Sequence, residues 1–218
     1  MSVQKETENQ RLLYVAFGNS LTLGVGAGYA PGFVQRYRCL AETELQRRVI
    51  GRIYARSGAT AGEIATFLDS YQAEQAIKHA SIITISAGGN DLILAAKHYL
   101  QTKDKSRFTQ ALSESQAAVA KMLTIISTIK ATQAKPYIIR LLGLYNPLPE
   151  IALGDKWVQA FNSGLHGFSN KNIRVANVFS AFKGNERELL SQDRVHPNAK
   201  GYEVIANTLH QLGYAPLI

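Results

Sequence analysis

Short apolar runs rich in β-branched and aromatic residues recur along the chain. They occupy residues 12–17, 49–55, 81–86, 137–142 and 173–178. Runs of this length, bounded by polar or glycine-containing segments, are typical of buried strands. The hydrophobic pattern therefore predicts five strands.

The segments between these runs have helical spacing. Residues 33–48 carry apolar side chains about three or four positions apart, and residues 107–132 do so over a longer stretch. The expected buried stripes are Phe33, Tyr37, Leu40, Ala41 and Leu45 in the first, and Leu112, Val119, Met122, Leu123, Ile126 and Ile129 in the second. Strands that alternate with helices predict an α/β fold, in which helices cover both faces of a parallel sheet.

The last predicted helix has a clear start. Pro197 sets the entry and Asn198 is a good N-cap, and an apolar stripe follows at Tyr202, Ile205, Ala206, Leu209 and Leu212. His196 therefore stands just before a helix. Asp193 precedes it by three residues, a spacing that lets the two side chains approach each other in a turn.

Ligands of parallel α/β sheets bind beyond the carboxyl ends of the strands. Ser20 follows the first predicted strand, in a turn. A serine becomes a nucleophile when a histidine takes its proton and a carboxylate orients that histidine. Ser20, His196 and Asp193 are the candidates for these three roles.

Acyl transfer also needs hydrogen-bond donors for the oxyanion that forms on the substrate. Three groups that follow predicted strands suit this role. They are the backbone N–H of Ser20, the N–H of Gly58 in "RSGAT" and the side-chain amide of Asn90 in "AGGND".

Four segments, in order, carry a family resemblance: "FGNSLTLG", "RSGAT", "GGND" and "DRVHPNAKGY". They resemble the four blocks of the SGNH (GDSL-like) hydrolase superfamily, and "GLYNP" at 143–147 is similar to a segment of its bacterial lipase and acylhydrolase group. The resemblance implies a flavodoxin-like three-layer α/β/α sandwich and ester hydrolysis through an acyl-enzyme. It also implies a Ser20–His196–Asp193 triad, an oxyanion hole of Ser20, Gly58 and Asn90, and no metal or organic cofactor.

One position departs from the family pattern. Asn19 stands where the family usually has aspartate, and it keeps an acceptor oxygen but lacks the charge. We expect Asn19 and Asp91 to organise the loops that carry the site. Leu144, Tyr145 and Leu148 are candidates for the wall of an acyl pocket.

Composition places the chain among ordinary globular proteins, since 46% of its 218 residues are hydrophobic and 18% are charged. We expect one domain over residues 11–218 after a polar, poorly ordered leader at 1–10. The net charge of +8 is spread along the chain, so nucleic-acid binding is not expected. The lone Cys39 excludes a disulfide within the chain, and its place in a predicted helix favours a buried or half-buried side chain.

No apolar run reaches the length of a membrane span, and residues 1–10 do not resemble a signal peptide. The sequence as it stands predicts a soluble, cytoplasmic protein. An extracytoplasmic or secreted location would apply if a leader had been removed.

Three functions stay open at this point. The first is hydrolysis of short to medium acyl esters, and the second is removal of O-acetyl groups from cell-wall polysaccharide. The third is ligand binding without catalysis. In each case the expected partner is a small-molecule, lipid or sugar ester. The glycines of "GVGAG" at 24–28 have the wrong spacing for a dinucleotide site, and we expect them to keep the loop after Ser20 open beside the substrate.

Overall fold

A five-stranded parallel sheet forms the centre of the computed structural model, which describes residues 11–151 and 153–218. The expected leader at 1–10 lies outside the described residues. The strand order is β2-β1-β3-β4-β5, the flavodoxin-like order. The strands are β1 (Arg11–Gly18), β2 (Arg48–Ala55), β3 (Ile82–Ser86), β4 (Ile138–Leu142) and β5 (Ile173–Ala176), each close to its predicted bounds.

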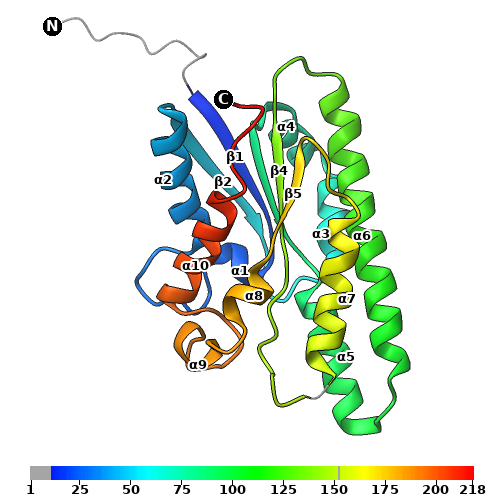
Figure 1. Cartoon of the computed structure of the whole chain (residues 1–218). Helices are drawn as coiled ribbons and strands as arrows, with labels where there is room; N and C mark the ends of the chain where they lie inside the picture. The colour runs from blue at the N-terminus through cyan, green and yellow to red at the C-terminus, as the bar shows by residue number, and fades with distance from the viewer. Residues whose placement is uncertain (1–10, 152) are drawn as a thin grey trace, which may run out of the picture.

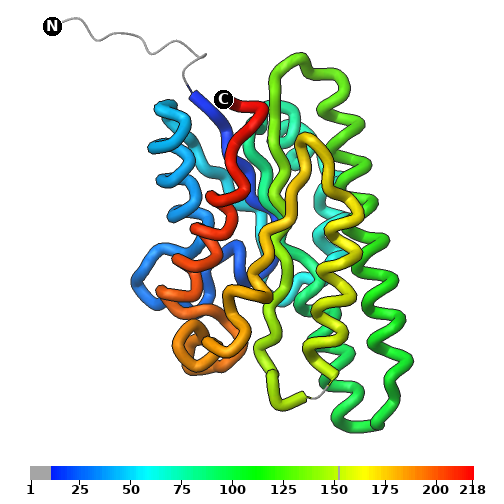
Figure 2. The backbone as a smooth tube through the Cα atoms, in the orientation of Figure 1, coloured from blue at the N-terminus to red at the C-terminus, as the bar shows by residue number. Residues whose placement is uncertain are grey.

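Helices pack on both faces of the sheet, as Figures 1 and 2 show. On one face lie α3 (Ala61–Leu68), α4 (Tyr71–His79), α5 (Gly89–Thr102), α6 (Ser106–Ala131) and α7 (Gly154–His166). On the other lie α1 (Ser20–Leu23), α2 (Phe33–Leu45), α8 (Val178–Phe182), α9 (Glu186–Leu189) and α10 (Ala199–His210). The predicted three-layer α/β/α architecture is confirmed.

The apolar stripes build two cores, one on each face of the sheet. Val119, Met122 and Ile126 of α6 are buried in the first core. Tyr202 and Ile205 of α10 are buried in the second. Burial of these stripes, at about 25 cal/mol per Å² of apolar surface, is what fixes the helices on the sheet.

Two expectations about α2 need correction. The helix ends at Leu45 and not at residue 48, because Gln46 takes a left-handed conformation (φ 49°) that stops helical hydrogen bonding. Cys39 is exposed and not buried, because it lies two positions from Tyr37 and so points to the opposite side of the helix.

The carboxyl ends of the strands meet at the lower edge of the sheet in Figure 1, where the loops after β1, β3 and β4 and the α9–α10 connection gather. This is the edge at which ligands of parallel sheets bind. Among the described residues, no helix is both long and apolar enough to cross a lipid bilayer.

Candidate active site

Ser20 lies at the first position of α1, directly after β1. Asn19 is the N-cap of this short helix, and its Oδ1 accepts hydrogen bonds from the Leu21 N–H at 3.1 Å and from the Ser86 hydroxyl at 3.3 Å. A side-chain cap of this kind fixes the turn at a helix start. The Asn19 side chain therefore bonds to the turn that carries Ser20.

His196 and Asp193 lie in the loop between α9 and α10, which is closed by a bridge between Leu190 and Pro197. The His196 Nε2 is 2.9 Å from the Ser20 Oγ, and its Nδ1 is 2.6 Å from the Asp193 Oδ2. The fold thus brings together a hydroxyl and an imidazole that are 176 residues apart in the chain. The three side chains form one continuous series of hydrogen bonds.

The second oxygen of Asp193 accepts three further hydrogen bonds. Its Oδ1 is 2.8 Å from the Val195 N, 2.9 Å from the His196 N and 2.9 Å from the Ser191 Oγ. Partial desolvation opposes ionisation, but the bonds from His196, Val195 and Ser191 outweigh it and hold the pKa of Asp193 well below its usual range. The carboxylate is therefore charged at neutral pH, as an imidazole partner requires.

The candidate oxyanion donors are not equally placed. Asn90 lies in the first turn of α5 and lines the same cavity as Ser20, and its Nδ2 donates to the Ala59 carbonyl at 2.8 Å. This bond orients the amide and uses one of its two N–H groups. Gly58 lies one residue before Ala59 with a left-handed φ of 79°, but it is not among the residues that line the cavity.

Asp91 connects the starts of two helices. Its Oδ2 accepts from the Ala61 N–H of α3 at 3.0 Å, while the residue itself lies in the first turn of α5. Burial raises the pKa of this carboxyl, and the hydrogen bond from Ala61 partly offsets that effect. Asp91 therefore links the segment after Gly58 to the segment of Asn90.

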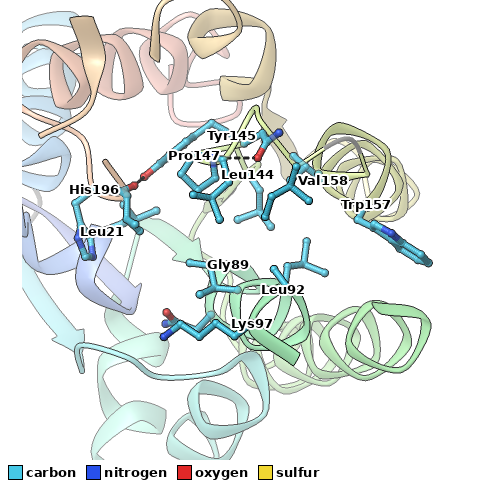
Figure 3. Close-up of a pocket in the computed structure, with 18 of the residues that line it drawn as sticks. Leu21, Gly89, Leu92, Lys97, Leu144, Tyr145, Pro147, Trp157, Val158 and His196 are labelled. Carbon is cyan, nitrogen blue, oxygen red and sulfur yellow. Dashed lines mark hydrogen bonds between the residues drawn. The ribbon is translucent and has the colours of Figure 1, made fainter. Parts of the chain in front are cut away.

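A cavity of about 330 Å³ opens beside Ser20 and His196. Leu144, Tyr145 and Leu148, the three pocket candidates, all line it. Figure 3 shows the cavity between α5, which contributes Gly89 and Leu92, and the segment after β4. The other apolar residues that line it are Leu21, Ile93, Ala96, Phe108, Pro147, Ile151, Trp157, Val158 and Val195.

Sequence reasoning missed the far wall of this cavity. Phe108 of α6 and Trp157 of α7 stack there, with ring centroids 5.1 Å apart. Phe108 lies within the helical stretch predicted at 107–132, and no motif in the sequence marks Trp157. Their contact depends on how α6 and α7 pack, for which the chain carries no local signal.

Two asparagines that sequence reasoning also missed shape the near wall. Asn162 of α7 accepts from the Leu144 N–H at 2.7 Å and donates to the Leu144 carbonyl at 2.8 Å. Asn146 accepts from the Leu148 N–H at 3.0 Å and donates to Asp155 at 2.8 Å. These bonds satisfy main-chain groups of residues 144 and 148, so they stabilise the irregular conformation of the segment after β4.

Tyr145 has a second contact besides the cavity. Its hydroxyl donates to the Val195 carbonyl at 2.6 Å, and its ring stacks on Phe182 with centroids 4.4 Å apart. In Figure 3 it reaches from the segment after β4 toward His196. The pocket wall and the histidine loop are thereby joined.

One expectation about the glycines after Ser20 is wrong. Residues 24–28 are not among those that line the cavity beside Ser20. The loop instead runs beside the histidine segment, where Gly26 comes close to His196.

A flavodoxin-like sheet with a hydroxyl, an imidazole and a carboxylate hydrogen-bonded in series at its carboxyl edge is typical of the SGNH class of hydrolases. The comparison with known families agrees. The chain belongs to the GDSL-like lipase/acylhydrolase family, whose model matches residues 16–204. It is a carboxylic ester hydrolase.

Individual relatives support the same placement. The chain is 42% identical to the spore germination lipase LipC of Bacillus licheniformis over 94% of its own length and 98% of that protein. It is also 42% identical in sequence to the lipase Lip_vut3 from a goat rumen metagenome. The crystal structure of that lipase matches this fold with a TM-score of 0.92, over 95% of this chain and all of that one. A family 3 carbohydrate esterase of Clostridium thermocellum shares only the fold, at 16% identity and a TM-score of 0.63 over 92% and 94% of the two chains.

Proposed function

We propose that this protein is a serine esterase that cleaves short to medium acyl esters through an acyl-enzyme. The observation that carries the proposal is the series Asp193–His196–Ser20, with separations of 2.6 and 2.9 Å, at the mouth of a largely apolar cavity. No metal or cofactor is needed for this chemistry.

In the first step the Ser20 Oγ attacks the ester carbonyl carbon while its proton passes to the His196 Nε2. An imidazole whose Nδ1–H donates to Asp193 has its Nε2 lone pair directed at Ser20. The ionised Asp193 stabilises the imidazolium that forms. The C–O bond to the alcohol then breaks, and His196 gives its proton to the departing oxygen.

The oxyanion of the tetrahedral intermediate needs donors beside Ser20. Asn19 caps the Leu21 N–H, so the cap does not use the Ser20 N–H at the start of α1. The second N–H of the Asn90 amide and the N–H of Gly58 complete the proposed hole. Each such donor contributes about 10²- to 10³-fold in rate.

Deacylation repeats these steps with water in place of the alcohol. His196 takes a proton from water, the hydroxyl attacks the acyl carbonyl, and the Ser20 Oγ leaves with the proton. The carboxylic acid is released and the Ser20 hydroxyl is restored with a proton from water, while the original serine proton has left with the alcohol.

The cavity favours an acyl chain over a sugar. Its volume of about 330 Å³ is at the small end of the range for small-molecule sites, roughly 300–1,000 Å³. Leucine, isoleucine, proline and aromatic side chains form most of its wall, whereas a polysaccharide ester would call for a polar groove. A binder without catalysis would have no need of the aligned Asp193–His196–Ser20 series.

The test is a panel of p-nitrophenyl esters from acetate to palmitate, beside acetylated xylan, for the wild-type protein and Ser20→Ala. We expect the highest kcat/KM on short to medium chains, and a loss of at least ~10³-fold in Ser20→Ala because the nucleophile is gone. Ser127→Ala, which removes an exposed serine of α6, is the matched control and should behave as wild type.

A fluorophosphonate probe adds a test of the nucleophile itself. It should label the wild-type protein and Ser127→Ala but not Ser20→Ala. Retained hydrolysis in Ser20→Ala would overturn the mechanism. Failure of the wild-type protein to label would favour a binding protein, and a preference for acetylated xylan would favour the deacetylase.

A further inference from the structure

The loop between α1 and α2 lies against the loop that carries His196. In Figures 1 and 2 the chain after α1 runs beside the segment between α9 and α10. Three glycines in it, Gly24, Gly26 and Gly28, have left-handed φ values of 83°, 94° and 66°. The chemistry described above does not use any of them.

Gly26 lies close to the loop that carries His196. A Cβ placed on Gly26 would lie 2.6 Å from the Pro197 carbonyl oxygen, 2.9 Å from the His196 Cβ and 3.1 Å from the Ser191 Oγ. The first two atoms belong to the main chain and to the base of a side chain, so neither can move aside by a change of rotamer. The histidine loop therefore rests directly on the Gly26 backbone.

The same glycine loop is anchored on the nucleophile side. The Val25 N–H donates to the Ser20 carbonyl at 3.0 Å, and the Gly24 N–H donates to the Leu21 carbonyl at 3.1 Å. On the far side, the buried Tyr202 of α10 donates its hydroxyl to the Val25 carbonyl at 2.6 Å. The loop thus joins the turn of Ser20 to the helix that follows His196.

We propose that Gly26 is a positioning residue that sets the separation between the Ser20 Oγ and the His196 Nε2. The proposal rests on the proposed function of these two side chains. A side chain at position 26 would displace the histidine loop as a unit, because Asp193 and His196 are bonded within that loop. The imidazole would keep its carboxylate and lose its alignment with the serine.

Gly28 offers a matched control for this proposal. It lies two residues further along the same loop and shares the left-handed backbone, but a Cβ on it would meet nothing within 4 Å. Gly26→Ala and Gly28→Ala both put a side chain on a left-handed backbone, with φ values of 94° and 66°, and the Tm of each variant reports the cost of that strain. They differ in whether the added methyl group pushes on His196 and Pro197.

The experiment compares kcat, KM and Tm of both variants with wild type on p-nitrophenyl butyrate, and the rate of labelling by a fluorophosphonate. Gly26→Ala should lower kcat and the labelling rate by ~10- to 100-fold, with KM within about threefold, because misplacement of a catalytic group by about 1 Å costs up to ~10²-fold. Gly28→Ala should keep both rates within about twofold of wild type. Equal kcat values for the two folded variants would overturn the proposal, and so would a rise in KM at unchanged kcat.

Tyr202→Phe keeps the proposal testable if Gly26→Ala does not fold. This variant removes the hydroxyl that holds the Val25 carbonyl and adds no bulk, so kcat should fall a fewfold at constant KM. An unchanged kcat would count against the proposal. Failure of the proposed function itself would look different, because Ser20→Ala would then retain activity whatever Gly26→Ala does.

Discussion

The two ends of the sheet hold charged side chains in opposite ways. At the carboxyl end, the Asp193 side chain is 47% exposed and bonded to an ionisable partner, His196. Toward the amino end, Arg140 of β4 and Lys130 of α6 are buried, with 0% and 3% exposure. Among the described residues neither of these cations contacts a carboxylate.

The buried cations bind main-chain carbonyls instead. Arg140 donates to the carbonyls of Ile139, Asn172 and Gly213, the last at 2.6 Å. Lys130 donates to the carbonyls of Lys78 and Ala80, before β3. A buried charge is costly to desolvate, so these bonds are needed to make the burial tolerable. The comparison teaches that the charged group at the carboxyl end is bonded to another ionisable side chain, while the buried cations at the other end are bonded to main-chain carbonyls.

The largest effect is expected at the carboxyl end. Asp193→Asn should lower kcat by ~10³- to 10⁴-fold, because an amide stabilises neither the required tautomer nor the imidazolium. Steady-state kinetics on p-nitrophenyl butyrate measures this, with thermal unfolding as the check on folding. Asp69→Asn, at an exposed carboxylate paired with Lys121, is the control and should retain wild-type rates. A fall of less than tenfold in Asp193→Asn would show that the carboxylate does not serve His196.

At the other end, the expected effect is on stability alone. Arg140→Met should lower the unfolding free energy by about 2–4 kcal/mol, because buried carbonyls lose their donors. Urea denaturation measures the loss, and kcat of the folded variant should not change. Arg174→Met is the control, since Arg174 of β5 pairs in register with Arg140 of β4 but is exposed and donates to the Leu212 carbonyl. An equal loss in both variants would contradict the comparison.

We expect the unfolding free energy to depend on pH because of Lys130, at the same end of the sheet. Burial lowers the pKa of Lys130 to about 8. Between that pH and the unfolded pKa of about 10.4, the unfolded chain holds a proton that the folded protein has released, so the unfolding free energy rises with pH. Below pH 8 both states are protonated and the full cost of burying the charge applies.

The measurement is the difference in unfolding free energy between wild type and Lys130→Met at pH 7 and pH 9.5. Wild type should gain about 1–2 kcal/mol relative to the variant over this range. Other groups that titrate in both proteins cancel in the difference. A difference that stays constant or falls with pH would show that the ammonium of Lys130 is not disfavoured by folding.

The smallest effect is expected at Asn19. Asn19→Asp should leave kcat/KM equal or raise it by up to about threefold, because a carboxylate oxygen can accept from the Leu21 N–H and the Ser86 hydroxyl as a charge-assisted bond. Asn19→Leu, which has a similar shape but no acceptor, should lower it. A large loss in Asn19→Asp would mean that the amide has a part of its own.

Local sequence patterns predict the strands and the start of α10, and they mark the candidate nucleophile, base and acid. The Asn198 cap illustrates why: its side chain accepts from the N–H groups of Lys200 and Gly201, all within one turn. The five apolar runs are likewise properties of consecutive residues. The four segments that resemble the family blocks, in order, imply Ser20 and His196 as site residues.

Contacts between distant segments were not predictable in this way. Tyr145 was a candidate for the pocket wall, but its bond to the Val195 carbonyl, 50 residues away, has no sequence signal. Arg140 interrupts a predicted buried strand, and the reason for its presence is the Gly213 carbonyl 73 residues later. The glycines after Ser20 are predicted to lie beside the substrate, but Gly26 lies against the histidine loop. The sequence does not indicate which neighbouring segment a loop will contact.

By itself, then, the sequence determined the alternation of strands and helices, because that follows from the periodicity and type of neighbouring residues, and its resemblance to a known family supplied the candidate residues of the site. Only the tertiary structure decided the 2.9 Å approach of His196 to Ser20, the close fit of Gly26 under the histidine loop and the apolar walls of the cavity. These depend on how helices and loops from both ends of the chain pack on one sheet edge. Packing of that kind is a property of the whole core and is not encoded in any single segment.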